Sequence, residues 1–133
     1  MKPLAAVLSA LAATAALAGP YDQPYSIITS ERTPSADPHL RAVIVNRVDD
    51  ENALANYAVV LPGLHKVTLD LPKRKGFKLA TQETLELDTR PCVRYVVAAE
   101  LKSVTLQEWT PVVRREERIG ECEAKFKVAA GAK

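Results

Sequence analysis

Few residues of this chain could carry chemistry, and His65 is the first of them. An imidazole can act as a general base or bind a metal ion. His65 shares one face of an alternating stretch with Val67, Leu69 and Leu71, which favours a structural histidine. The alternative is a small secreted hydrolase or inhibitor-like domain, with a loop site built from His65 and Asp49-Asp50. No Gly-x-Ser-x-Gly pattern or recognisably activated serine accompanies the histidine, so we expect no catalytic residue.

The acidic stretch Asp49-Asp50-Glu51-Asn52 gathers hard oxygen ligands of the kind that calcium prefers. It lacks the spaced alternation and the glycine of a calcium-binding loop, and adjacent carboxylates on a strand point in different directions. The stretch therefore predicts a solvated polar turn. We expect neither a bound metal nor an organic cofactor.

Two cysteines, Cys92 and Cys122, are present. Two thiols in an exported chain most often pair, because the compartment is oxidising. A link closing a loop of about 30 residues stabilises a domain by roughly 3.5–4 kcal/mol on the chain-entropy model. We predict a structural disulfide. Two free buried thiols, or a redox-active or metal-bound pair, are the alternatives, and no Cys-x-x-Cys spacing supports the redox one.

Two further features are candidates for binding a partner. Lys73, Arg74 and Lys75 form a basic loop with Phe77 near its tip, which could bind an anionic glycan or an acidic protein patch. The alternative is an ordinary solvated loop. Trp109, the one tryptophan, could anchor a partner, or it could pack at the rim of a sheet.

Residues 1–18 have the layout of a secretory signal peptide. Lys2 precedes the apolar run from Leu4 to Leu17, and Ala16-Leu17-Ala18 supplies a small-x-small cleavage site. The run is too short to span a bilayer, which needs about 20 apolar residues. We predict a periplasmic or secreted protein with no integral membrane segment after cleavage.

The charge of the mature chain is nearly balanced. Without Lys2, 17 of the 18 basic residues remain against 16 acidic ones. Such a chain has no electrostatic reason to seek nucleic acid. The expected partner is an unknown envelope protein or a glycan, and the oligomeric state stays open.

The domain organisation follows from proline content and periodicity. Residues 19–38 contain four prolines, which predict an extended tether with a short edge segment over Ser26 to Thr29. Residues 39–128 form the predicted domain, and residues 129–133 a frayed tail.

Period-two patterning within the domain predicts strands. The predicted strands are 41–48, 57–61, 65–71, 81–88, 92–99, 104–113 and 120–128. The first is apolar on both faces and is expected to be central, and Pro111 marks an edge strand. No helix is expected. The pattern indicates an all-β protein, a small antiparallel β-sandwich of six to seven strands.

The stretch from Leu61 to Leu69, with its Pro62-Gly63 turn and following strand, resembles PEGA domains and related carboxypeptidase-regulatory-like modules. The resemblance extends from about Arg41 to Asp88, although the loop 49–56 lacks the usual glycines and the Gly-x-Thr-Pro element. It implies an exported β-sandwich that acts as a non-catalytic binding or structural accessory module in the cell envelope. It transfers no functional residue to this chain.

Overall fold

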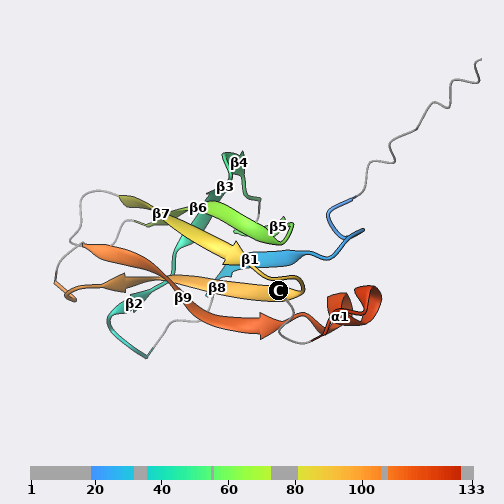
Figure 1. Ribbon diagram of the computed structural model, residues 1–133. Helices are drawn as coiled ribbons and strands as arrows, with labels where there is room; N and C mark the ends of the chain where they lie inside the picture. Colours follow the sequence, from blue (N-terminus) through green and yellow to red (C-terminus); the bar gives the residue numbers. More distant parts are fainter. Residues whose placement is uncertain (1–18, 32–35, 55, 73–80, 106–107, 130–133) are drawn as a thin grey trace, which may run out of the picture.

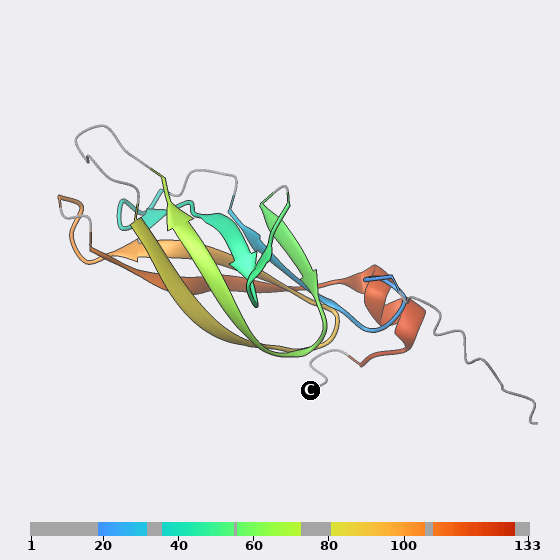
Figure 2. The same cartoon turned by 90° about the horizontal axis from the view of Figure 1, so that it is seen from above.

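The computed structural model describes residues 19–31, 36–54, 56–72, 81–105 and 108–129. One sheet contains β1 (Ser26–Ser30), β2 (Leu40–Arg41), β5 (Tyr57–Val60), β8 (Val93–Leu101) and β9 (Trp109–Arg118). The second sheet contains β3 (Ile44–Val48), β4 (Glu51–Asn52), β6 (Gly63–Leu71) and β7 (Thr81–Thr89). The two sheets lie as layers, with the helix α1 (Gly120–Phe126) at one end (Figures 1 and 2). The predicted all-β, sandwich-like class is confirmed.

β8 is the centre of the first sheet. It pairs antiparallel with β9 and β2 and parallel with β1, whose far side pairs with β5. Seven of its nine residues are buried, because valine and alanine fill both of its faces. β9 pairs with β8 alone among the described strands, so the edge position that Pro111 predicted is confirmed.

The second sheet follows the order β4-β3-β6-β7 and is antiparallel throughout. The alternation predicted for 65–71 and 81–88 is confirmed, since Val67 and Leu69 are fully buried while Lys66 and Glu86 are exposed. Inward-facing residues of both sheets form one core. Its completely buried members include Ile28, Val67, Leu69 and Val97.

The folded unit begins earlier than the sequence indicated. β1 lies within the predicted tether, yet it forms between β8 and β5 rather than at an edge. Its burial alternates, and Ile28 is completely inaccessible. No proline falls between residues 25 and 33, and the β-branched residues of this stretch suit a strand. The prolines therefore flank a core strand instead of defining a spacer.

The predicted strand 41–48 is wrong as a single central strand. β2 pairs with β8 in one sheet, whereas β3 pairs with β6 in the other. The chain crosses between the layers at Ala42 and Val43. Val43 and Val45 face the core, while Ala42 and Ile44 are exposed. The apolar residues on both faces of 41–48 arise because the chain passes from one sheet to the other, and not because a single strand is buried on both sides.

The predicted strand 120–128 and the expected absence of helix are also wrong, because residues 120–126 form α1. Cys122 and Phe126 are four residues apart and share a helix face, while Ala124 is exposed. Glu, Ala and Lys favour helix. α1 has seven residues, and no helix in the described part of the chain is long and apolar enough to cross a membrane.

The predicted disulfide between Cys92 and Cys122 is confirmed. It joins the turn before β8 to α1, with both cysteines almost completely buried. Tyr25 and Ile119 pack around it in a second, smaller core. The predicted signal peptide, residues 1–18, lies outside the described residues, as do residues 130–133 of the predicted tail.

Candidate functional site

The polar turn predicted at residues 49–52 joins β3 to β4. Asp49 and Asp50 both have positive φ, at 50° and 67°, as a two-residue type I′ hairpin turn requires. Aspartate tolerates this conformation better than most residues with a side chain. The turn directs the Asp49 carboxylate toward the start of β6, where the backbone N–H of Lys66 donates to it at 2.9 Å.

His65 connects this turn to the turn before β6. Its Nδ1 contacts the Asp49 carboxylate, and its Nε2 contacts the backbone carbonyl of Leu61. The Thr89 hydroxyl donates to the same carbonyl at 3.3 Å. Only 13% of the His65 side chain is exposed. Its ring connects the β3–β4 turn to the turn before β6, and we call these two contacts the Asp49–His65 clasp. The structural interpretation of His65 fits these contacts.

The clasp has a consequence for proton transfer. Both ring nitrogens of His65 face an acceptor within the protein, one the Asp49 carboxylate and the other the Leu61 carbonyl. A catalytic base instead needs a lone pair directed at its substrate or nucleophile. The hydrogen bond from His65, followed by that from the Lys66 backbone, lowers the pKa of the Asp49 carboxyl. Asp49 is thus held in its charged form.

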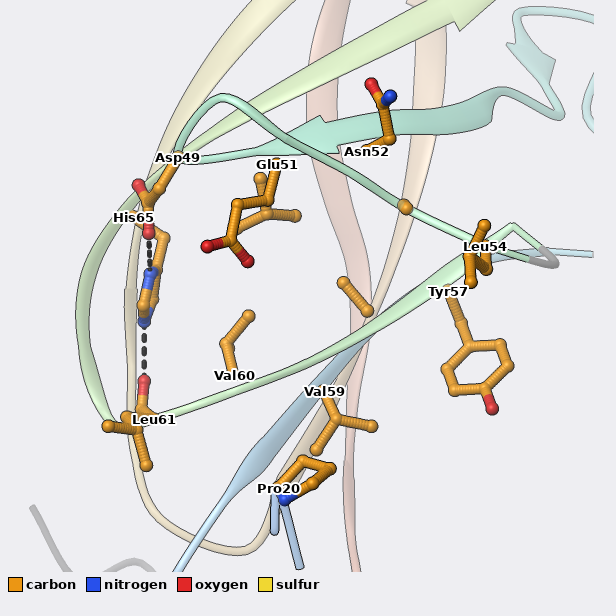
Figure 3. A pocket seen from close by; sticks show the side chains of 13 residues that line it. Pro20, Asp49, Glu51, Asn52, Leu54, Tyr57, Val59, Val60, Leu61 and His65 are labelled. Carbon is orange, nitrogen blue, oxygen red and sulfur yellow. Dashed lines mark hydrogen bonds and ion pairs between the residues drawn. The ribbon is translucent and has the colours of Figure 1, made fainter. Parts of the chain in front are cut away.

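A groove of about 490 Å³ lies beside this clasp, within the range of about 300–1,000 Å³ that is usual for ligand clefts. Its lining residues are Pro20, Val48, Asp49, Glu51, Asn52, Ala53, Leu54, Tyr57, Ala58, Val59, Val60, Leu61 and His65. Figure 3 shows His65, Asp49 and Leu61 at one end, Leu54 and Tyr57 at the other, and Glu51 directed into the space between them. The groove is the side of the sandwich where β5 of one sheet faces the β3–β4 hairpin of the other.

The lining of this groove is mainly apolar and partly exposed. The exposed fraction is 80% for Leu54, 40% for Tyr57 and 48% for Leu61. Ala58 and Val60 of β5 are half-buried and pack against the core. A contiguous apolar surface rimmed by carboxylates is typical of an interaction site.

Asn56 holds the two walls of the groove together, and sequence reasoning missed it. Its side-chain oxygen accepts from the Val45 backbone N–H of β3 at 2.6 Å, and its side-chain nitrogen donates to the Ser30 hydroxyl of β1 at 2.7 Å. The amide therefore bridges the two sheets just before β5. The one available signal was an asparagine ahead of an apolar run, at a backbone position with φ of 62°.

Of the other candidate binding residues, only Trp109 belongs to the described part of the chain, and it does not line this groove. Lys73, Arg74, Lys75 and Phe77 lie outside the described residues. Trp109 is buried, with 7% exposed, and its Nε1 donates to the Thr81 hydroxyl at 2.6 Å. The indole packs in the main core. This fits a packing role for Trp109 and leaves little ring surface for a partner.

The charged residues beside the groove do not gather around a common point. Among the residues that the structure describes, no group of three or more His, Cys, Asp or Glu side chains could hold a metal ion. Comparison of the chain with protein-family models, curated proteins and solved structures found no match. The PEGA-like resemblance stays a prediction from the sequence.

Proposed function

We propose that this chain is an exported, non-catalytic binding module of the cell envelope, and that the groove beside β5 is its binding site. The observation that carries the proposal is the unprotected edge of β5. Tyr57–Val60 is a short apolar strand that pairs with β1 on one side only among the described strands. Its other side opens onto the apolar groove.

The other long edges of the sandwich are protected against pairing. β9 carries Pro111 and the charged run Arg114 to Arg118, and β7 carries Glu83, Glu86 and Asp88. Proline and charged side chains are the usual means by which proteins block unwanted pairing at sheet edges. β5 has neither. Since the rest of the molecule uses these devices, their omission at β5 supports a binding role for this edge.

The disulfide supports the exported location. Cys92 and Cys122 are linked and buried, and such bonds persist in oxidising compartments such as the periplasm or the extracellular space. The near balance of charge favours a protein or glycan partner over nucleic acid.

A hydrolase is the second candidate, because His65 does meet a carboxylate at the edge of a groove. The orientation of Nε2 toward the Leu61 carbonyl argues against it. In addition, no serine, threonine or cysteine lines the described groove. A general base without a nucleophile in reach lacks the arrangement of acyl-transfer enzymes.

Differential capture tests the proposed function. The mature protein and its Leu54→Ser/Leu61→Ser variant are immobilised and exposed to an extract of the cell envelope, and bound proteins are identified by mass. Both leucines are exposed, so the variant should fold. Val104→Ser, at an exposed apolar residue outside the groove, is the matched control.

We expect partners that the wild type and the control retain and the groove variant loses. Identical profiles for all three proteins would refute the groove as the binding site. If His65→Ala abolished a hydrolytic activity of the wild type without unfolding it, the hydrolase alternative would replace the proposal.

A further inference from the structure

We infer that the groove takes an extended strand of a partner protein, which adds to the sheet beside β5 and places a lysine or arginine near Glu51. This inference rests on the proposed function and specifies the chemistry of the ligand. It joins three observations: the free edge of β5, the apolar walls of the groove and the charge at its rim.

The first observation concerns the backbone of β5. In a strand, successive N–H and C=O groups point to alternate sides, so a strand paired on one side presents unpaired groups on the other. β5 pairs with β1 through Val59 and Ala58 opposite Ile27 and Ile28. An isolated bridge to Leu54 occupies only Tyr57, the first residue of β5. The remaining edge, Ala58 to Val60, is about 10 Å long at roughly 3.3 Å per residue and matches a short added strand.

The second observation concerns the walls on either side of that edge. Ala58 and Val60 pack toward the main core, whereas Val59 packs toward the smaller core around the disulfide. A strand continuing this sheet would direct alternate side chains toward the groove and away from it. The groove-facing ones would meet Ala53 and Leu54 of the opposite wall. Medium-sized apolar residues at every second position fit this space.

The third observation is the sign of the charge. Asp49 and Glu51 line the groove, Asp50 adjoins them, and no lysine or arginine is among the described residues of the lining. Asp49 is already bound by His65, whereas Glu51 is directed into the groove (Figure 3). A basic side chain on the added strand would therefore meet a carboxylate. A second copy would bring the same acidic turn, which disfavours self-pairing.

The probe is the synthetic peptide acetyl-Lys-Val-Lys-Val-Thr-Val-Lys-amide. Its binding to the disulfide-bonded mature protein is measured by amide chemical shifts, which also locate the site. The decisive comparison uses two N-methylated isomers, one methylated at the three valines and the other at the threonine and the second and third lysines. N-methylation removes the backbone donors along one edge of the peptide and leaves all its side chains.

Strand addition predicts that one isomer binds within about threefold of the parent peptide. The other should lose roughly tenfold or more in affinity, because it lacks the backbone donors of the hydrogen bonds to β5. Glu51→Gln should weaken the parent peptide by roughly two- to fivefold, as for an exposed ion pair. A peptide with glutamate in place of lysine should not bind. Val104→Ser should leave every affinity unchanged.

The outcomes separate the inference from the function on which it rests. Equal binding by the two isomers, or no binding of the parent peptide, would refute strand addition, while differential capture decides independently whether the groove binds a partner. Shift changes away from β5 would also refute it. A concentration-dependent dimer that sedimentation detects in the wild type but not in Leu54→Ser/Leu61→Ser would make a second copy the occupant.

Discussion

Removing the link between Cys92 and Cys122 should cost this domain a large share of its stability. The two cysteines are 30 residues apart, and the chain-entropy relation gives about 3.6 kcal/mol at 25 °C for a loop of that size. The total stability of a single domain is typically about 5–15 kcal/mol. The double variant Cys92→Ala/Cys122→Ala also loses sulfur contacts with Tyr25 and Ile119 in the smaller core, so it should lose at least as much.

Urea denaturation of the oxidised wild type, the reduced wild type and the double variant measures this loss. With a slope of ~1.5 kcal/mol per molar urea, the midpoint should fall by about 2.4 M. Far-ultraviolet circular dichroism in water shows whether each form still folds. A loss below about 1 kcal/mol in both the reduced wild type and the double variant would contradict this expectation. It would mean that the closed loop restricts the unfolded chain much less than assumed. Thiol titration under denaturing conditions should find no free thiol in the oxidised protein.

Three further substitutions test individual contacts by urea denaturation. Asp49→Asn should lower the free energy of unfolding at pH 7 by less than about 1 kcal/mol, because the carboxylate is half exposed. Since its pKa is lowered from an ordinary value of 3.8, this difference from the wild type should vanish as the pH falls through that lowered pKa, and a constant difference would contradict the clasp. Thr81→Val removes the acceptor of the Trp109 indole N–H and should cost about 1–3 kcal/mol with a change in tryptophan fluorescence, whereas Thr81→Ser should not. The Ser26 hydroxyl is fully buried and has no hydrogen-bond partner among the described residues, so Ser26→Ala should be neutral or stabilise by up to about 1 kcal/mol. Ser30→Ala, which removes an acceptor in use, should destabilise.

Much of the fold could be predicted because burial in a sandwich repeats every two residues. In β6 and β7 each side chain faces either the core or the solvent, so the alternation of Val67 and Leu69 with polar residues directly records the structure. The same holds for Pro111, whose missing donor is compatible only with an edge. These inferences needed no knowledge of which strands pair.

The predictions were wrong where the local sequence pattern does not determine which residues are buried. Within residues 120–128, the apolar residues at 122, 124, 126 and 128 alternate as in a strand, but Cys122 and Phe126 also fit one face of α1. The disulfide, which ties residue 122 to a distant turn, is a long-range constraint that no local pattern shows. The segment of β1 was predicted over Ser26 to Thr29 but wrongly placed at an edge, because its position depends on pairing with β8, more than 60 residues away.

Part of the site was predicted from the same two-residue alternation that predicted the strands. The alternation placed His65 at the end of a strand, and its proximity to Asp49 was a hypothesis that the structure bears out. The groove could not be predicted, since its walls belong to different sheets. Asn56, which joins those sheets, binds Val45 and Ser30 through contacts 11 and 26 residues along the chain.

The exposed apolar edge of β5, proposed above as a binding site, is also an aggregation hazard, and the surroundings of β5 limit that hazard. The strand has only four residues and ends two residues before Pro62, so an added strand cannot extend its pairing far. The β3–β4 hairpin lies across the groove, and the Asp49–His65 clasp closes one end of it. The hairpin and the clasp limit how much of another chain can approach this edge, and the charged rim disfavours the apolar stacking that drives aggregation. The short length and the surroundings of β5 therefore reduce the open-ended stacking that a longer bare strand would allow.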